Sequence, residues 1–345
     1  MITIPIIVLN WNGLEDTLAC MDSLSRQTYT DFEVYLADNG SEGSDVTALK
    51  ERFSDNTKVH LRFNASNLGF TKAHNIIFEE LLKMEYKYIV TLNNDTVQEP
   101  DWLEKLVQFA ETHQVDMVSS KMINYFDRNI MDNAGHLMLN TAEIVPYASG
   151  EPIENWTKSF QNVGPCAGAA LYSTAMMRVI GVFDERFSTG YEDAEYGLRA
   201  TILGYKSLFA PEAIVYHKVS ASINKVMNYE YKLGIQENIF YTYYKLMPKS
   251  VQWLNFPSFL FKYSAIFFID IVLGRKVFYK VMKDAWSRTL GVNQEAIQTS
   301  RKDFFSKHKP LNILQIRRLQ TFFLWFDIKR FWKFVVVGEK SFLER

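Results

Sequence analysis

Three places in the sequence carry carboxylate or imidazole groups that could do acid–base or metal chemistry. Asp95 ends the motif Asn93-Asn94-Asp95, which follows the apolar run 88–92. A carboxylate there could hold a hard divalent cation such as Mg²⁺ against a diphosphate, because such cations prefer oxygen ligands. His217 ends another apolar run far along the chain, and its imidazole could complete that coordination. Taken alone, however, Asp95 is more often a helix cap and a lone histidine is more often structural.

Two adjacent carboxylates, Glu192 and Asp193, follow Gly190 in a predicted turn and precede a helix expected over residues 194–203. One of them could take a proton from an alcohol if the turn brings it within hydrogen-bond reach of a substrate. Capping of the helix by Asp193 is the alternative interpretation. The two roles are compatible, because one turn can cap a helix with one carboxylate and direct the other into a cleft.

Polar motifs also follow the earlier apolar runs. Asp38 begins the sequence Asp38-Asn39-Gly40-Ser41, and its carboxylate could accept a hydrogen bond from a pyrimidine imide or a ribose hydroxyl. An ordinary turn explains these residues equally well, because Asp, Asn, Gly and Ser are all common in turns. Asn10-Trp11-Asn12-Gly13 and Asn67-Leu68-Gly69-Phe70 occupy equivalent places after other runs. Only the combination of motifs favours a binding site.

An alternation of apolar runs and amphipathic stretches would position these side chains. The runs cover residues 4–9, 32–37, 59–63 and 88–92, and the stretches cover residues 16–24, 46–53, 71–82 and 102–112. Runs of this kind predict strands and the stretches predict helices. We therefore expect an α/β fold with a mostly parallel sheet, flanking helices and ligands at the carboxyl ends of the strands. Neither a G-x-G-x-x-G motif nor a Walker loop follows the first run, which excludes the usual dinucleotide and P-loop sites.

The composition predicts a globular protein kept in a reducing compartment. The chain has 345 residues, of which 48% are apolar and 22% charged. Its two cysteines, Cys20 and Cys166, exclude a disulfide framework and a four-cysteine zinc site. Its first residues lack the charged n-region of a signal peptide, so a cytoplasmic location is expected.

The charge is distributed unevenly along the chain. Residues 1–244 contain 19 Lys and Arg against 32 Asp and Glu, whereas residues 245–345 contain 19 against 7. The basic part is also rich in aromatic and aliphatic residues, which suits an anionic bilayer surface better than nucleic acid. A solvated basic helical domain is the alternative.

The basic region is not expected to cross a membrane. Its longest apolar stretch, residues 263–269, stops at Asp270 and is much shorter than the roughly 20 residues that a span requires. Residues 313–337 mix basic side chains with large apolar ones, as expected of a helix lying in the plane of a membrane surface. A helix packed on the main domain, or one that contacts a second copy in a homodimer, is the alternative.

Taken together, seven ordered blocks between residues 4 and 217 resemble family 2 glycosyltransferases, especially the bacterial rhamnosyltransferase-like branch. Besides the motifs around Asn10, Asp38, Asn67 to Asn75 and Asp95, the blocks include Gly181-Val182-Phe183-Asp184-Glu185-Arg186-Phe187, Tyr191-Glu192-Asp193 with Leu198-Arg199, and Pro211-Glu212-Ala213-Ile214-Val215-Tyr216-His217. The resemblance implies a GT-A fold over residues 1–225, a nucleotide-sugar donor, a divalent metal such as Mg²⁺ or Mn²⁺, and inversion at the anomeric carbon. Residues 226–345 resemble the family only in being helical and apolar.

The resemblance also implies roles for residues of the donor site. Asp38 would hold the pyrimidine base, and Asn10 and Asn12 would line its pocket. Asn67 and Gly69 would shape the loop around the nucleotide.

Further roles follow for the rest of the predicted site. Asn75 would support the nucleotide loop from its helix. Asn94 and Asp95 belong to the stretch that matches the family's D-x-D-type motif and would bind the donor, with Asp95 and His217 on the metal. The first position of that motif is Asn93, which removes one carboxylate from the cation's shell.

On the acceptor side, Asp193 would be the general base, with Glu192 as its neighbour or its alternate. The stretch from Gly164 to Gly168 resembles the lining of the sugar and acceptor cleft.

The function expected from the resemblance is an inverting, metal-dependent glycosyltransferase, a hexosyltransferase of bacterial surface polysaccharide synthesis. Its donor would be dTDP-rhamnose ahead of UDP-linked hexoses, and its acceptor a hydroxyl of a glycan, free or linked to a polyprenyl diphosphate as in O-antigen assembly. The enzyme would work peripherally on the inner face of the plasma membrane. The alternatives are a sugar-nucleotide pyrophosphorylase and a non-catalytic module of the same fold in an assembly complex.

Overall fold

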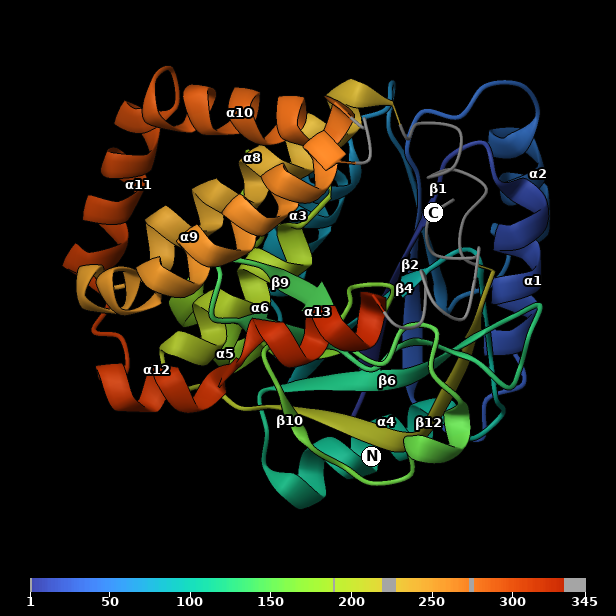
Figure 1. Ribbon diagram of the computed structural model, residues 1–345. Helices are drawn as coiled ribbons and strands as arrows, with labels where there is room; N and C mark the ends of the chain where they lie inside the picture. Colours follow the sequence, from blue (N-terminus) through green and yellow to red (C-terminus); the bar gives the residue numbers. More distant parts are fainter. Residues whose placement is uncertain (1, 189, 219–227, 273–275, 332–345) are drawn as a thin grey trace. The chain divides into compact units, whose positions relative to one another are not determined.

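Figure 1 shows the computed structural model, which describes residues 2–188, 190–218, 228–272 and 276–331. The chain divides into two compact units. Unit 1 comprises Met1–His136, Pro146–Thr201 and Tyr205–Val219, and unit 2 comprises Leu137–Val145, Ile202–Gly204 and Ser220–Arg345. The boundary expected between residues 225 and 226 lies outside the described residues, and the assignment of a function to each part stays a prediction.

Unit 1 is built on one mixed sheet with the strand order β10-β12-β6-β11-β4-β1-β2-β3. The strands β1 to β4 are mutually parallel, as their helical connections require. The bounds are β1 (Ile4–Asn10), β2 (Phe32–Asp38), β3 (Val59–Phe63), β4 (Tyr88–Asn93), β6 (Met117–Asn124), β10 (Gln161–Asn162), β11 (Ala169–Ser173) and β12 (Ser207–His217), with β5 (Thr96–Gln98) paired to β12 and β7 (Met131–Asn133) paired to β6. The predicted mostly parallel sheet is confirmed.

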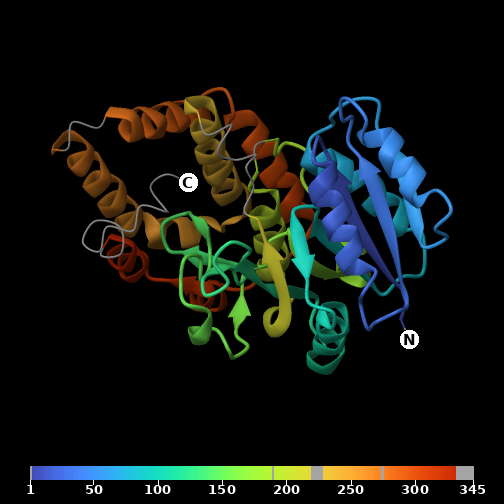
Figure 2. The same ribbon diagram turned by 90° about the vertical axis from the view of Figure 1, so that its right-hand side faces the viewer.

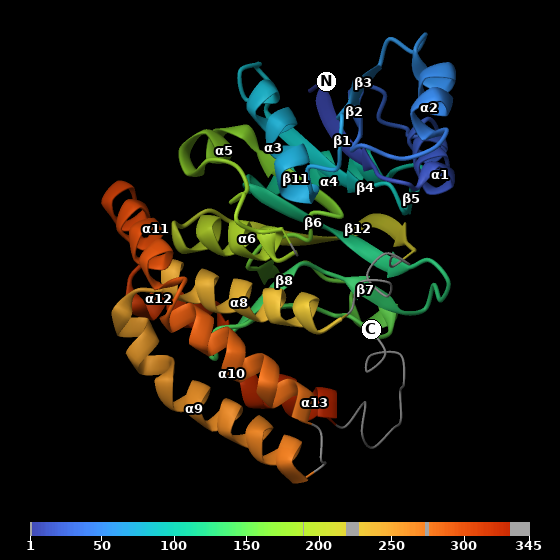
Figure 3. The same ribbon diagram turned by 90° about the horizontal axis from the view of Figure 1, so that it is seen from above.

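Helices connect the strands and cover the sheet. They are α1 (Leu14–Leu24), α2 (Asp45–Phe53), α3 (Phe70–Leu81), α4 (Trp102–His113), α5 (Thr174–Ile180) and α6 (Glu192–Ile202). The first four coincide with the predicted amphipathic stretches to within two residues. Figures 1 and 3 place α1 and α2 on one side of β1 and α3 on the other.

The core of unit 1 lies between the sheet and these helices. Ile6 and Val8 of β1 and Val90 of β4 are fully buried in one cluster with residues of α1 and α4. Ile7, between Ile6 and Val8, is also fully buried, so β1 is covered on both faces, as strands of a parallel sheet usually are. The turned view in Figure 2 shows these first strands, in blue, beside the blue helices that connect them.

The antiparallel strand β11 lies between β4 and β6 and shapes the functional edge of the sheet. Ala169, where β11 begins, pairs with Leu92 near the end of β4, and the Asn93 amide donates to the Gly168 carbonyl. Because the two strands run in opposite directions, the loop that precedes β11 lies at the carboxyl end of β4. The stretch from Gly164 to Gly168 is thereby brought to the same edge as the motif that ends in Asp95.

A close backbone contact fixes α6 against that loop. Gly164, with φ 150°, faces Gly197 in the middle of α6, and a Cβ added at Gly197 would lie 2.7 Å from both the Gly164 Cα and the Val163 carbonyl oxygen. Real Cβ atoms do not come so close to backbone. The small size of Gly164 therefore serves the packing of α6. The lining of the sugar and acceptor cleft by the stretch from Gly164 to Gly168 stays a prediction.

Unit 2 is mostly helical. Its helices are α8 (Tyr229–Leu246), α9 (Lys249–Val272), α10 (Lys276–Leu290), α11 (Gln294–Lys307), α12 (Ile313–Leu319) and α13 (Phe323–Phe331), and α10 packs against both α8 and α9 (Figures 1 and 3). A small sheet orders β13 (Gln320–Thr321), β8 (His136–Leu139) and β9 (Ile144–Pro146). The Lys262 ammonium on α9 forms ion pairs with Glu143 and Asp327.

The single helix expected over residues 313–337 is not continuous. α12 ends at Leu319, and Gln320 is extended and pairs with Met138 of β8 as part of β13 before α13 begins. Pairing with β8 thus breaks the predicted helix, and residues 332–337 lie outside the described residues. Within the described ranges, every helix is too short or too polar to span a bilayer.

The contact between Gly164 and Gly197 makes a prediction about stability. Gly197→Ala should lower the free energy of unfolding by about 1–3 kcal/mol, because the new methyl group overpacks the contact. In open space the same change in a helix would raise stability by about 1 kcal/mol. Urea denaturation of the full chain measures the change in the free energy of unfolding. A variant as stable as the wild type, or more stable, would contradict the contact.

Candidate active site

Backbone pairing brings Asp95 and His217 together. His217 ends β12 and pairs with Thr96 of β5 on one side and with Asn124 of β6 on the other. Asp95 directly precedes Thr96, and the Asp95 carbonyl accepts a hydrogen bond from the Lys218 amide at 2.9 Å. The two side chains, more than 120 residues apart in the sequence, therefore meet at the edge of the sheet: His217 Nε2 lies 3.2 Å from Asp95 Oδ1.

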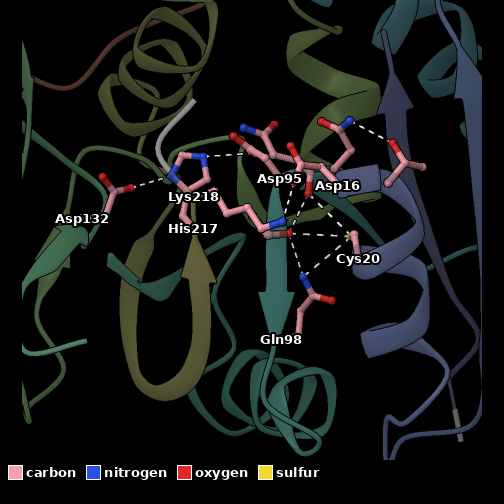
Figure 4. Close-up of polar contacts among 11 residues, drawn as sticks. Asp16, Cys20, Asp95, Gln98, Asp132, His217 and Lys218 are labelled. Atoms are coloured by element: carbon pink, nitrogen blue, oxygen red, sulfur yellow. Dashed lines mark hydrogen bonds and ion pairs between the residues drawn. The ribbon is translucent and has the colours of Figure 1, made fainter. Parts of the chain in front are cut away.

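A bulge adds Asp132, a residue that the sequence did not reveal. In the pairing of β6 with β7, Met122 opposes Asn133 and Ile123 opposes Met131, which leaves Asp132 as the extra residue. Bulges redirect side chains next to functional sites. Here the Asp132 carboxylate accepts a 2.8 Å hydrogen bond from His217 Nδ1 (Figure 4).

The three groups are mostly shielded from solvent and interact electrostatically. The exposed fractions of the side chains are 13% for His217, 14% for Asp95 and 13% for Asp132. Burial alone would lower the pKa of His217, but the charges of Asp132 and Asp95 outweigh it and raise the pKa to about 10. Burial would raise the pKa of Asp95, and its contact with His217 reverses that effect and lowers the pKa. Without another ligand, His217 is thus an imidazolium at neutral pH.

Lys218 adds a second cation to this edge. Its ammonium forms an ion pair with Asp16 of α1 (Figure 4).

Cys20 of α1 lies beside the motif that ends in Asp95, with its thiol 3.7 Å from the Asn93 carbonyl oxygen and 3.8 Å from Thr96 Oγ1. Burial raises the pKa of Cys20 to about 12, so this thiol is a neutral packing group.

Asp95 and His217 fit a divalent cation. His217 Nε2 is buried and forms no hydrogen bond with the residues that the structure describes, although Asp95 lies within ion-pair distance. A carboxylate on the other ring nitrogen, as Asp132 provides, fixes the orientation and tautomer of metal-binding histidines. Coordination needs the neutral imidazole, so a cation and a proton would compete for Nε2.

The pair would supply only part of a cation's shell. Among the described residues, no three His, Cys, Asp or Glu side chains converge as a complete metal site. Magnesium commonly uses one or two protein groups and completes its shell with water and substrate phosphates. The donor set therefore suits a cation that arrives with a diphosphate.

The predicted nucleotide residues cluster at the ends of β1 and β2. Asn10 Nδ2 donates to Asp38 Oδ2 at 2.7 Å and to Asp45 Oδ2 at 3.0 Å, and Asn10 Oδ1 accepts from Thr17. Asp38 also accepts a hydrogen bond from the Ser41 amide. Asn10 therefore links two carboxylates at this edge, and Asp38 is fully buried.

Two loops border this cluster. Asn12 has a positive φ of 49°, its amide donates to Ser41 and its side chain accepts from the Glu42 amide. Asn67 accepts from the Asn39 side chain and from the Gly69 amide, and Gly69 has a φ of 79° that favours glycine. Asn12, Asn67 and Gly69 thus hold the loops that surround Asp38.

Two of the predicted donor residues have different partners. The Asn75 side chain is buried and exchanges hydrogen bonds with the Phe183 backbone, so it ties α3 to the segment between α5 and α6. Its support of the nucleotide loop stays a prediction. Asn94 Nδ2 donates to Thr17 Oγ1 of α1. Both residues fix secondary structure elements around the site.

Asp193 sits at the start of α6 and faces the loop before β11. Its Oδ2 accepts a 3.0 Å hydrogen bond from the Ala167 amide and lies 3.8 Å from His136 Nε2, and its Oδ1 accepts from the Ala194 amide. The contact between Gly164 and Gly197 holds this helix against the loop and so positions the carboxylate. His136 is a second residue that the sequence did not reveal.

Burial changes the protonation of Glu192, which directly precedes Asp193. Burial, followed by the charge of Asp193, raises the pKa of Glu192 to about 8, so Glu192 is mostly protonated at pH 7. Burial also raises the pKa of Cys166 well above its usual value, with further contributions from Asp193 and Asp132. Asp193 is bonded to the Ala167 amide in the loop that precedes β11, and this loop lies at the same edge of the sheet as the motif that ends in Asp95.

Three residues of the candidate site were not predicted from the sequence: Lys218, Asp132 and His136. Lys218 directly follows His217, and a basic residue at the end of a strand was a signal that could have been used. Asp132 and His136 lie in short strands without a clear hydrophobic period, and their roles arise from a bulge and from packing. No local pattern marked either one.

The coupling of His217 to Asp132 predicts a pH dependence of stability. Because the pKa of His217 is raised in the folded state, the charged contact contributes fully below about pH 6.5, the ordinary histidine pKa, and is lost as the pH rises towards about 10. In Asp132→Asn, this loss should occur at lower pH. Urea denaturation at a series of pH values, without metal, measures the free energy of unfolding of the wild type and of Asp132→Asn. Asp127→Asn, a change at an exposed residue, serves as control. Identical pH profiles in the wild type and both variants would contradict the coupling.

Known proteins match this chain in sequence. The model of the family described as Glycosyl transferase family 2 matches residues 6–178. An O-antigen biosynthesis protein RfbC from Myxococcus xanthus is 28% identical over 237 residues, covering 63% of this chain and 17% of that protein. An N-acetylglucosaminyl-diphospho-decaprenol L-rhamnosyltransferase from Mycobacterium tuberculosis is 22% identical, with 64% of this chain and 78% of that protein covered. The chain spans only 17% and 16% of the first two curated relatives.

Solved structures share the fold. A mannosyltransferase from Pyrobaculum calidifontis, in complex with GDP-Man and Mn²⁺, aligns with a TM-score of 0.52 at 13% identity and covers 88% of this chain and 85% of that one. GalNAc-T7 with UDP, GalNAc and Mn²⁺ aligns with a TM-score of 0.54 at 15% identity, covering 71% and 50%. These likenesses support the GT-A type of fold. With half of its residues matched by the family model, the chain belongs to glycosyl transferase family 2.

Proposed function

We propose that this chain is a metal-dependent, inverting glycosyltransferase that moves a sugar from a nucleoside diphosphate to a hydroxyl group. The observation that carries the proposal is the contact of Asp95 with His217, oriented by Asp132, at the carboxyl edge of the sheet in a family 2 protein. This edge is where ligands bind in open α/β sheets.

The chemistry requires a leaving diphosphate and an attacking alcohol on opposite faces of the sugar. A divalent cation bound by Asp95 and His217 would offset the negative charge that develops on the diphosphate. The Lys218 ammonium, which is ion-paired with Asp16, lies at the same edge. Asp193 accepts the proton of the alcohol, and its hydrogen bond from the Ala167 amide holds the carboxylate in place.

We propose a pyrimidine nucleotide as the carrier of the sugar, with Asp38 as the acceptor for the base. The buried Asp38 and its partner Asn10 lie at the ends of adjacent parallel strands. Within this class we favour dTDP-L-rhamnose over UDP-linked hexoses. The resemblance of the sequence blocks to the rhamnosyltransferase-like branch and the similarity to a relative named as an L-rhamnosyltransferase support this choice.

For the acceptor we propose a glycan, free or linked to a polyprenyl diphosphate, in the synthesis of a bacterial surface polysaccharide. The relative named for O-antigen biosynthesis supports this class. We further propose that the protein works on the inner face of the plasma membrane. The excess of basic residues over residues 245–345 and exposed aromatic side chains such as Trp253 and Trp325 support a peripheral contact.

The site supports neither of the alternative functions, a sugar-nucleotide pyrophosphorylase or a non-catalytic module. A pyrophosphorylase needs basic residues after the first strand to grip a triphosphate, and residues 10–14 contain none. A non-catalytic module would have no need for Asp95, His217 and Asp193 together at one edge.

Substitution of each of the two adjacent carboxylates in turn tests which one is the general base. Asp193→Asn should reduce transfer by about 10²–10⁴-fold, the usual contribution of general-base catalysis, while donor affinity stays within a few fold. Glu192→Gln is the matched control and should retain most activity at pH 7, since Glu192 is already mostly neutral there. If the glutamine variant is inactive and the asparagine variant active, Glu192 is the base instead.

Removal of Asp95 tests the metal site. We expect Mn²⁺ to tighten dTDP binding to the wild type. Asp95→Ala should weaken that effect by at least about 10-fold, because changing even an outer-shell partner of a metal ligand usually costs that much. Calorimetry with and without Mn²⁺ measures both proteins. Asp22→Ala, an exposed change on α1, serves as control. Equal enhancement by Mn²⁺ in the wild type and Asp95→Ala would count against the assignment.

A thermal-shift screen tests the donor. A ligand that binds only the folded protein raises the melting temperature by mass action. In the presence of Mn²⁺, dTDP-L-rhamnose should raise it more than UDP-glucose or UDP-galactose at equal concentration. A larger shift with a UDP-hexose would replace rhamnose as the proposed sugar.

A further inference from the structure

An apolar cavity opens in unit 2 between α9 and α10. Its volume is about 290 Å³, close to the lower end of the roughly 300–1,000 Å³ typical of sites for small organic molecules. Its lining includes Phe259, Tyr263, Ile266, Met282, Lys283 and Trp286. All of these residues belong to unit 2.

The inner wall of the cavity is rigid and aromatic. The Phe259 ring packs in a tilted arrangement against Tyr263, with ring centroids 4.3 Å apart, and against Trp286, with centroids 5.4 Å apart. The same three residues pack onto the core formed by Leu233, Phe240 and Ala285. This wall is therefore part of a packed helical core, and a ligand would meet a preformed surface.

Few polar groups face the cavity. Apart from the two tyrosines, Ser264 and Lys283 are the polar side chains in its lining, and both are exposed. The Tyr263 hydroxyl donates to Glu143 at 3.3 Å. A sugar or a nucleotide would lose hydrogen bonds with water in such a place, whereas a hydrocarbon would gain from leaving water.

Helix α9 also carries exposed apolar side chains. Leu260 of the lining is 54% exposed, and Phe261 and Phe268, elsewhere on the helix, are 59% and 66% exposed. Apolar surfaces of this kind mark contacts with membranes or partners. The cavity lining belongs to residues 245–345, a part of the sequence with 19 basic residues against 7 acidic ones, and this excess favours an anionic ligand.

We propose that this cavity binds one hydrocarbon chain of a phosphate-bearing lipid. The chain lies against Phe259, Met282 and Trp286, and the Lys283 ammonium at the edge contacts the phosphate. The inference goes beyond sugar transfer and does not depend on it, because every residue that carries it belongs to unit 2.

The test uses dodecyl phosphate, below the concentration at which it forms micelles, titrated into the full chain in a calorimeter. Ser264→Phe fills the cavity from its exposed side and should weaken binding at least tenfold. Ser264→Ala leaves the space open and should bind as the wild type does. Leu260→Trp narrows the mouth independently and should also weaken binding.

Substitution of two lysines tests whether the charge of Lys283 contributes to binding, with Lys302 as the matched control. Lys283→Gln should weaken the binding of dodecyl phosphate several fold, whereas Lys302→Gln, on the exposed side of α11, should not. Inorganic phosphate alone and dodecyl maltoside, which has the chain without the charge, should both bind more weakly than dodecyl phosphate. Cooperative urea unfolding confirms that each variant is folded.

Several results would overturn the proposal. Equal binding to Ser264→Phe, Leu260→Trp and the wild type would show that the chain adheres to the outer face and not to the cavity. Inorganic phosphate binding as tightly as dodecyl phosphate would show a plain anion site. Dodecyl phosphate that fails to bind the wild type would also contradict it. Transfer to a water-soluble acceptor should be unchanged in Ser264→Phe, which separates this inference from the proposed reaction.

Discussion

The pairing of β12 with β5 and β6 is the constraint on which the candidate site depends. It places His217 opposite Thr96 and Asn124, so the imidazole comes to rest beside Asp95 and within reach of Asp132 in the bulge of β7. A slip of one residue would turn His217 to the opposite face of the sheet. Buried charges of opposite sign are therefore held together by backbone hydrogen bonds, and their attraction adds to an arrangement that the sheet already imposes.

Burial then gives these groups distinct chemical states. Two carboxylates raise the pKa of His217, so the metal-free edge carries an imidazolium between Asp95 and Asp132, and the Lys218 ammonium is paired with Asp16. A divalent cation bound at this edge would supply the positive charge that the proposed leaving diphosphate requires. Near α6, burial raises the pKa of Glu192 and leaves that residue mostly neutral at pH 7, next to Asp193.

The sheet and the ends of its first strands could be predicted because strand and helix periods are local properties of the sequence. Asp95 and His217 were found because both follow apolar runs, which places them at strand ends. Asp132 could not be found this way, because the bulge that directs it exists only once β7 pairs with β6. The same reason explains the break in the helix expected over residues 313–337: Gln320 pairs with a strand from a distant part of the chain, and local periodicity contains no information on such pairing.

The location of a bound cation tests the central claim most directly. Crystals of the full chain grown with dTDP and Mn²⁺ would give an anomalous scattering peak at the manganese position. The account predicts that this peak lies between the Asp95 carboxylate and His217 Nε2, with the diphosphate on its open side and Asp132 still bonded to Nδ1. Two results with dTDP bound would contradict the account: a manganese peak away from both residues, or no manganese peak.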